Sequence, residues 1–420
     1  MIYDLIIIGA GAAGLYAGAS LPCKKNGLIL EKSASPGKKL LLSGAGQCNL
    51  THGGSIKDFI SHYGLNGNRV RTILYRCSNQ SVIDFFTECG ISLFEREDGK
   101  IFPKSLRATD ILDCLTEQCR KNGLELRCSS AVNRIIYHPE SDDTGVLYTI
   151  VSGTSHLQTK KIIIATGGCS YPITGSDGSL FPMLQALGLS LNPLKPALAP
   201  LFVEEYPYND LSGISFQNAA VSLFAAGKQI AENCGPLLFT HNSFSGPGIL
   251  NLSRYVTSGM QLSVCYYPGR SEDVVLKELS SALSSSSKQF LTEIYEYFNR
   301  NRSKEQTDLE MPKRFLEVLC KRIGIDPAAK AAAIGKNQLR SIVKLILQDK
   351  FVLSKTGDFN TAMVTAGGIL LDEINTKTME SKRYPGMYFA GEVLDIDGDT
   401  GGYNLQFAFS SGWLAANSAF

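Results

Sequence analysis

A glycine-rich turn between a short apolar strand and a helical segment dominates the start of the chain. Residues 2–8 are Ile-Tyr-Asp-Leu-Ile-Ile-Ile, and Gly9-Ala10-Gly11-Ala12-Ala13-Gly14 follows directly, before a helical run over 15–21. In such a turn Gly9 allows the tight bend, Gly11 lets the backbone approach a pyrophosphate, and Gly14 lets the helix pack on the strand. The N–H groups and the dipole at the helix start favour an anion. The order therefore predicts a dinucleotide site.

A second apolar stretch, Leu28–Leu30, ends in Glu31, and Lys32 follows it. An acid about 20 residues beyond the glycines is expected to hydrogen-bond a ribose in this kind of fold. We therefore predict Glu31 and Lys32 as cofactor-binding residues. The alternative is an ordinary βαβ unit with a glycine turn, and the motif by itself does not separate FAD from NAD(P).

Composition limits the class of protein. The chain has 420 residues, 44% hydrophobic and 19% charged, which is typical of a soluble globular protein with two or three domains. The net charge of +2 gives no reason to expect nucleic acid or an anionic membrane as a partner. We see no membrane span, no signal peptide, no Cys-x-x-Cys pair and no metal-ligand spacing. A reduced cytoplasmic protein, either a monomer or a homo-oligomer, is expected.

The residue composition and the predicted secondary structure change twice along the chain. Residues 1–192 predict an α/β domain, with strands at 3–8, 28–31, 126–128, 147–151 and 161–165 and helices at 12–21, 68–76, 79–89 and 108–122. Prolines and short alternating strands from 193 to 271 predict an antiparallel β unit. Residues 272–347 show helical periodicity. We assign 272–337 to a helical insertion and 338–355 to the return to the β unit. Residues 356–420 complete the first domain.

Two later segments strengthen the cofactor prediction. A buried strand ends in Ala165-Thr166-Gly167, a turn that passes close to FAD in flavoproteins of the two-dinucleotide-binding type. After a strand at 387–390, Gly391-Glu392 places an acid where a ribityl hydroxyl can donate to it. The final helix, 404–418, opens with Asn404-Leu405, and its dipole would stabilise negative charge at the flavin N1–C2=O edge. The combination selects FAD over NAD as the tightly bound cofactor.

Five segments along the whole chain resemble the BaiN-like (YhiN-like) NAD(P)/FAD-dependent oxidoreductases, also described as aminoacetone-oxidase-like flavoproteins. They are 5–14, 36–51, 165–175, 239–247, and 365–368 together with 386–412. The resemblance implies an α/β fold, with a Rossmann-like FAD-binding domain interrupted by an antiparallel β-barrel-like unit and a small helical bundle. The family usually has Arg and Asn where Gln47 and His52 stand. The first change removes a charge near the flavin loop.

The resemblance also implies cofactor contacts for the backbone of Lys39-Leu40 and for Val132, the latter at the adenine. The glycine-rich loop from Ser43 to Asn49 could line the isoalloxazine ring with its N–H groups. Each prediction has a plainer alternative: Lys39 belongs to a solvated lysine pair, Val132 is a β-edge residue, and the loop from Ser43 to Asn49 is an ordinary turn.

Three residues are candidates for catalysis, each against a structural alternative. Cys48 is a redox or acid group if its thiol faces the flavin, and otherwise a packing residue. His241 could donate a proton, as histidine side chains often do in enzymes, or it could hold the inserted domain in place. Tyr403 could supply the proton that reduction of a double bond requires, and Tyr171, in another segment expected to border the flavin, could do the same.

The resemblance points to reduction of activated C=C bonds in small steroid- or bile-acid-like substrates, with NADH or NADPH as a transient donor. Because no second glycine motif is present, the nicotinamide would have no Rossmann domain of its own. Two alternatives stay open: an amine or amino-ketone oxidase that uses O₂, and a non-catalytic flavin-binding redox or partner module.

Overall fold

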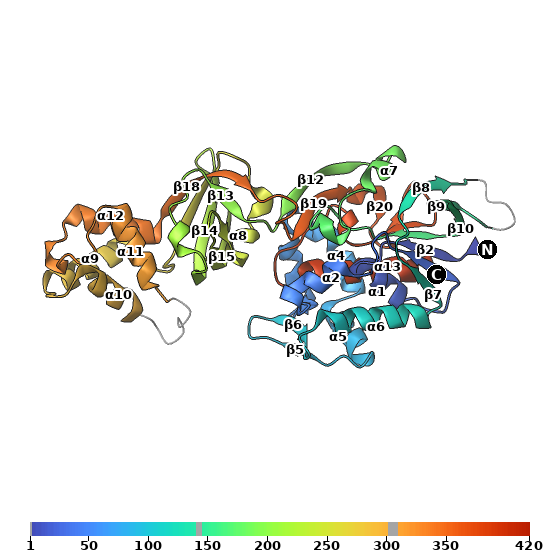
Figure 1. Ribbon diagram of the computed structural model, residues 1–420, viewed down its shortest axis with the longest axis horizontal. Helices are drawn as coiled ribbons and strands as arrows, with labels where there is room; N and C mark the ends of the chain where they lie inside the picture. The colour runs from blue at the N-terminus through green and yellow to red at the C-terminus, as the bar shows by residue number, and fades with distance from the viewer. Residues whose placement is uncertain (1, 140–144, 301–309) are drawn as a thin grey trace. The chain divides into compact units, whose positions relative to one another are not determined.

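The computed structural model describes residues 2–139, 145–300 and 310–420 of the chain. They form two units. One is built from both ends of the chain, up to Ala197 and again over Phe359–Phe420, and the other comprises Leu198–Asp358. In Figure 1 the blue N-terminal and red C-terminal segments are interleaved in the first unit, whereas the second unit runs from green to orange.

A seven-stranded sheet, in the order β20-β21-β22-β11-β2-β3-β7, forms the centre of the first unit. Its parallel strands are β22 (Met387–Phe389), β11 (Ile162–Ile164), β2 (Leu5–Ile8), β3 (Gly27–Leu30) and β7 (Leu124–Arg127). The antiparallel edge consists of β20 (Ile374–Asn375) and β21 (Glu380–Ser381). Every residue of β2, β3, β11 and β22 is buried, which explains their uninterrupted apolar runs.

Helices from opposite ends of the chain pack tightly against each other in this unit. A Cβ atom at Gly412 of α13 (Tyr403–Ala419) would lie 2.5 Å from the carbonyl oxygen of Ala13 in α1 (Ala12–Ala19). The other helices are α2 (Lys38–Leu42), α3 (Ile56–Phe59), α4 (Gly67–Arg76), α5 (Asn79–Glu88), α6 (Ala108–Lys121) and α7 (Phe181–Ala186). Within the described ranges, no helix has both the length and the apolar character needed to cross a membrane.

Three smaller sheets complete the first unit. One contains β1 (Ile2–Tyr3), β10 (Ser155–Thr159), β9 (Tyr148–Ser152) and β8 (Val132–Tyr137), and a second contains β4 (Thr51–His52), β6 (Lys100–Pro103) and β5 (Leu93–Glu95). The third pairs β12 (Leu191–Ala197) with β19 (Val364–Ile369). β9 and β10 form an antiparallel hairpin with Gly153 and Thr154 in its turn.

The second unit combines a closed barrel with helices around one apolar core. The barrel order is β13 (Leu201–Val203), β16 (Phe244–Ser245), β15 (Lys228–Phe239), β14 (Ser215–Ala225), β17 (Gln261–Cys265) and β18 (Asp349–Thr356). The helices are α8 (Pro247–Leu250), α9 (Glu272–Ser284), α10 (Phe290–Arg300), α11 (Lys313–Arg322) and α12 (Lys336–Leu347). Phe315 of α11 lies 4.6 Å from Tyr266 and 4.9 Å from Phe216, measured between ring centroids.

The boundaries of the insertion differ from those predicted. β12 pairs with β19, so residues 193–197 belong to the first unit, and the division falls at 197/198 and 358/359. α12 continues to Leu347 and β18 begins at Asp349, so the segment 338–355 that we assigned to the return to the β unit begins as helix, in agreement with the helical periodicity up to 347. Leu339, Ile342, Val343 and Ile346 are buried on one face of this helix, at the periodicity that the sequence shows.

Candidate functional site

The predicted dinucleotide turn lies between β2 and α1. Gly9 has a φ of 105°, and a Cβ atom there would lie 2.4 Å from the carbonyl oxygen of Ala165. A Cβ atom at Gly14 would lie 2.0 Å from the carbonyl oxygen of Gly9. Packing of the protein therefore explains both glycines. At Gly11, φ is −84° and no heavy atom lies within 4 Å of the Cβ position, so the packing of the protein does not require a glycine there, as expected if a ligand approaches the backbone closely.

This contrast predicts the effect of Gly11→Val. We expect the apoprotein to fold normally, because the added side chain enters open space, and FAD affinity to fall by ~100-fold, or about 2.7 kcal/mol. Flavin absorbance after purification and titration of the apoprotein with FAD measure the loss, and thermal melting checks the fold. Gly14→Val serves as the contrasting variant, since its clash with Gly9 should damage the fold itself. Full flavin content in Gly11→Val would contradict the assignment.

Glu31 directly follows β3, and backbone groups hold its carboxylate. The N–H of Ala10 donates to Oε2 at 2.9 Å, and the N–H of Ser33 donates to Oε1 at 2.7 Å. The carboxylate is thus fixed beside the glycine turn, where a ribose is expected. Lys32 forms an ion pair with Asp177, so its ammonium group already has a protein partner. Contacts of Glu31 and Lys32 with the cofactor stay predictions.

The loop from Ser43 to Asn49 contains a buried oxygen that lacks a donor. Asn49 Oδ1 accepts no hydrogen bond from any residue that the structure describes. Leaving such an atom unpaired costs about 1–3 kcal/mol, and a ligand that donates to it removes that cost. Ser176 Oγ, also buried without a described partner, lies 3.0 Å from the Cβ position of Gly167. Both atoms support a ligand site at this loop and at the Ala165–Gly167 turn.

A guanidinium group lies beside this loop even though position 47 is glutamine. Arg96 donates to Gln47 Oε1, and its guanidinium carbon lies 3.9 Å from the ring centroid of Phe102. Phe102 in turn lies against Gly44, 3.1 Å from its Cβ position. The positive charge that seemed lost with Gln47 is therefore supplied by the segment that joins β5 to β6.

Four segments that are distant in the sequence meet at Glu392. Lys39 Nζ donates to Oε2 at 2.6 Å, and the Ser170 hydroxyl and the Thr365 N–H donate to Oε1 at 2.8 and 2.7 Å. A carboxylate can accept about four hydrogen bonds, so one position stays open for a ligand hydroxyl. Lys39 and Glu392 were predicted from the sequence, whereas Ser170 and Thr365 were not, although they lie inside the recognised segments 165–175 and 365–368.

Another cluster of titratable groups surrounds the start of α13. The Tyr403 ring stacks on His62 at 3.9 Å and on His52 at 5.4 Å, with interplanar angles of 13° and 14°. His62 Nδ1 lies 3.0 Å from Asp399 Oδ2, and the N–H of Asp399 donates to the His62 carbonyl oxygen at 2.9 Å. A carboxylate thus orients an imidazole beside the Gly401-Gly402 turn. This pair was not predicted from the sequence: Asp399 lies in the recognised segment 386–412, but no motif marks His62.

The structure places the three catalytic candidates in different environments. Tyr403 is 5% exposed, and burial, together with the charges of Asp399 and Asp58, raises its pKa to about 12. Cys48 is fully buried, and burial raises the pKa of its thiol to about 12. The thiol is therefore neutral at physiological pH, which favours the packing role. His241 is exposed in the second unit, two residues after β15 ends.

The remaining predicted cofactor residues lie on several elements. Leu40 is buried on α2, and Val132 begins β8. A Cβ atom at Gly391 would lie 2.7 Å from the Cβ of Ala13, so the C-terminal segment touches the helix of the glycine motif. The Asn404 side chain bonds both backbone groups of Gly398 at 2.8 Å and shapes the preceding turn, while Leu405 packs against the core.

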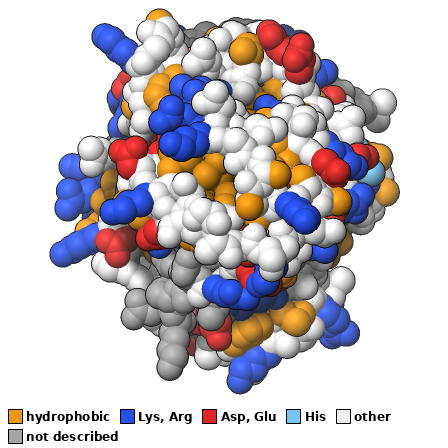
Figure 2. All heavy atoms as spheres, turned by 90° about the vertical axis from the view of Figure 1, so that its left-hand side faces the viewer, with side chains coloured by type: hydrophobic (Ala, Val, Ile, Leu, Met, Phe, Trp, Pro, Cys, Tyr) orange, Lys and Arg blue, Asp and Glu red, His pale blue; other side chains and the backbone are white. Residues whose placement is uncertain are grey.

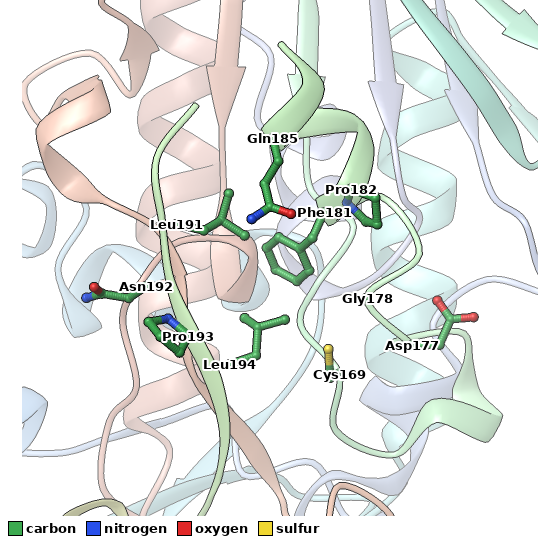
Figure 3. Close-up of a pocket in the computed structure, with 10 residues that line it drawn as sticks. All are labelled: Cys169, Asp177, Gly178, Phe181, Pro182, Gln185, Leu191, Asn192, Pro193 and Leu194. Carbon is green, nitrogen blue, oxygen red and sulfur yellow. The ribbon is translucent and has the colours of Figure 1, made fainter. Parts of the chain in front are cut away.

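An open pocket of about 450 Å³ lies elsewhere in the first unit (Figure 3). The pocket is lined by Cys169, Asp177, Gly178, Phe181, Pro182, Gln185 and Leu191–Leu194. None of the predicted cofactor residues lines it, so we do not assign it to the flavin. Among the described residues, no group of three or more His, Cys, Asp or Glu side chains is placed to hold a metal ion.

The residues present fit an FAD molecule. The open backbone at Gly11 suits the pyrophosphate, the fixed carboxylate of Glu31 suits a ribose, and the unpaired Asn49 Oδ1 suits a hydrogen-bond donor of the cofactor. These three features lie within the first 49 residues, and the carboxylate of Glu392, held by Lys39, adds a group from the other end of the sequence. They are therefore consistent with one extended ligand bound across the first unit.

Comparison with known proteins identifies a family and close relatives. The family described as "HI0933-like protein Rossmann domain" matches residues 3–418. Two relatives are named ribosomal RNA dihydrouridine synthase. The Haemophilus influenzae protein is 32% identical over 98% of this chain and 97% of its own, and the Escherichia coli protein is 29% identical over 99% and 97%. A 3-dehydro-bile acid delta(4,6)-reductase from Clostridium scindens is 27% identical over 98% of each chain.

These matches confirm the resemblance drawn from the five sequence segments and the Rossmann-type fold class with its inserted barrel. They also agree with the enzyme class predicted from the motifs. The chain belongs to the HI0933-like Rossmann family, and it is a FAD-dependent oxidoreductase.

Proposed function

We propose that this protein reduces a carbon–carbon double bond conjugated to a carbonyl group. The observation that carries the proposal is the His62–Asp399 pair stacked on Tyr403, at the start of the helix that the sequence assigns to the flavin. Such a reduction needs a hydride and a proton, and this pair is a proton source at the predicted site. The names of the three relatives describe saturation of bonds of this kind.

FAD supplies the hydride when it is bound, and NADH or NADPH is the proposed source of electrons. The N-terminus of α13 favours negative charge near it through its dipole and free N–H groups. In this role His62 would donate from Nε2, which makes no hydrogen bond to a described residue, while Asp399 orients the ring through Nδ1. The substrate then gains a hydride at its β-carbon and the His62 proton at its α-carbon. Solvent restores the proton on His62.

Two substrate classes have this chemistry. A steroid- or bile-acid-like enone is the class implied by the sequence resemblance, and the C. scindens relative supports it. The uracil ring of a uridine in RNA is the second, and it is supported by the names of the two relatives with the higher identities. We favour the uracil ring, although the net charge of the chain gave no reason to expect nucleic acid.

An anaerobic experiment tests the proposal. The purified protein is mixed with NADH, NADPH or an amine while flavin absorbance is followed, and an unmodified ribosomal RNA transcript or a 3-keto-4-ene steroid is then added. Bleaching by a nicotinamide, recovery on adding acceptor and a product with two added hydrogens are expected. Bleaching only by an amine, with peroxide released in air, would establish an oxidase instead. No bleaching by any donor would overturn the enzymatic proposal.

A further inference from the structure

Positive charge is concentrated in one part of the second unit. The whole chain has 41 Lys and Arg against 39 Asp and Glu, a net charge of +2. Residues 313–355 alone contain ten Lys and Arg against three Asp and Glu, a formal charge of +7. The rest of the chain is therefore net negative. The small net charge of the whole chain conceals this asymmetry. It gave no reason to expect nucleic acid as a partner, but that argument does not apply to this basic region.

The helix α12 carries a row of cations on its exposed side. Lys336, Arg340 and Lys344, here called the basic stripe, are all exposed and are spaced four residues apart, so they lie along one face. The opposite face is buried in the core of the second unit. Figure 2 faces the side on which α9 to α12 lie in Figure 1, and Lys and Arg side chains are spread over it.

No internal partner explains the basic stripe. α12 contains no acidic residue, and the three cations form no ion pair with a residue that the structure describes. Like charges four residues apart repel, and Lys336 stands in the first turn, where the helix dipole disfavours a cation. The neighbouring elements add to the charge, because Lys321 of α11 and Lys350 of β18 are exposed as well. Lys344, in the last turn, is favoured by the helix dipole, but the repulsion between the three cations and the position of Lys336 are relieved only if an anion outside the chain binds them.

We propose that the basic stripe binds the phosphate backbone of RNA. The cations repeat every ~6 Å along the helix axis, which suits a regularly charged polymer better than a single small anion. A membrane is a poorer fit, because the apolar face of α12 is buried in the core and cannot enter lipid. The inference rests on the proposed uracil substrate and gives the second unit a role in holding the RNA.

Binding by the full chain loaded with FAD tests this inference. The probe is a fluorescein-labelled RNA stem-loop from the unmodified transcript, and anisotropy is measured over a series of salt concentrations. The variant Lys336→Glu/Arg340→Glu/Lys344→Glu should bind ~10-fold or more weakly, and its salt dependence should decrease by about three charges. A matched control, Lys24→Glu/Lys121→Glu/Lys377→Glu, changes the net charge equally at exposed positions of the first unit and should bind as the wild type does.

Three outcomes would overturn the inference. They are no RNA binding by the wild type, equal weakening in the control, and stripe-dependent binding to phosphatidylserine vesicles in place of RNA. Reduction of the flavin by a nicotinamide provides a separate readout and should be the same in all three proteins. Stripe-dependent RNA binding without any dihydrouridine formation would refute the proposed reaction and leave the RNA surface standing.

Discussion

Replacement of His62 with glutamine is expected to slow substrate reduction by ~10²–10⁴-fold, the usual contribution of a positioned general acid. Glutamine fills similar space and can bond Asp399, but its amide cannot release a proton. Reduction of the bound flavin should stay at the wild-type rate, because that half-reaction does not use the proton of His62. Rapid mixing of the reduced enzyme with substrate, after reduction with dithionite, isolates the step in which the proton is needed.

Two further variants distinguish catalysis from general damage. His138 is another half-exposed histidine of the first unit, bonded to Thr149 at 2.9 Å, and His138→Gln should leave both half-reactions unchanged. Asp399→Asn should have a smaller effect than His62→Gln and should shift the pH profile, because Asp399 acts by positioning the imidazole. If His62→Gln reduced its substrate at the wild-type rate, another group, such as Tyr403, would be the proton donor.

The cofactor elements were predictable because their physical requirements are local. The strand Leu5–Ile8, the three glycines and Glu31 are close in sequence, and each shows its role through residue type and spacing. The fixed carboxylate of Glu31 and the open backbone at Gly11 then follow from the strand-turn-helix arrangement. A local pattern therefore predicted both the fold class and the region where the ligand should bind.

The proton-transfer cluster could not be predicted in this way. His62 and Asp399 are separated by 337 positions, and their contact depends on how a short 3-10 helix, Ile60–Asn66, meets the turn before α13. Gln47 posed the same problem, because the charge missing at that position is supplied by Arg96, which is distant in sequence. Contacts of this kind depend on tertiary packing and leave no periodic pattern in a single sequence.

The misplaced domain boundary has a different physical cause. Prolines at 193 and 196 indicated an irregular stretch, yet both lie in β12, which pairs with β19. The ladder has an irregularity between Asn192 and Lys195, and β12 belongs to a sheet of two strands. Proline is tolerated at such edge and bulge positions, since no neighbouring strand needs its missing N–H. These prolines therefore belong to an edge strand, and they do not indicate a change of domain.

Replacement of Asp349 with alanine is expected to destabilise the second unit by ~1–3 kcal/mol, the cost of leaving buried hydroxyl groups without their acceptor. Asp349 is fully buried at the start of β18, and Arg322 of α11 contacts both of its oxygens at 2.9 Å. The hydroxyls of Tyr208 and Tyr266 also donate to it. Burial raises the pKa of Asp349, while Arg322 and the two hydroxyls oppose that shift.

A double variant separates the ion pair from simple loss of packing. Urea unfolding of Asp349→Ala should show a lower midpoint, because the guanidinium and two buried hydroxyls lose their acceptor. Adding Arg322→Met removes the unpaired guanidinium, which is partly exposed, and should recover only a small part of the lost free energy if the pair itself contributes to stability. If the double variant were less stable than Asp349→Ala, then the Arg322 stem packed over Tyr208 and Phe351, rather than the pair, would hold α11 on the barrel.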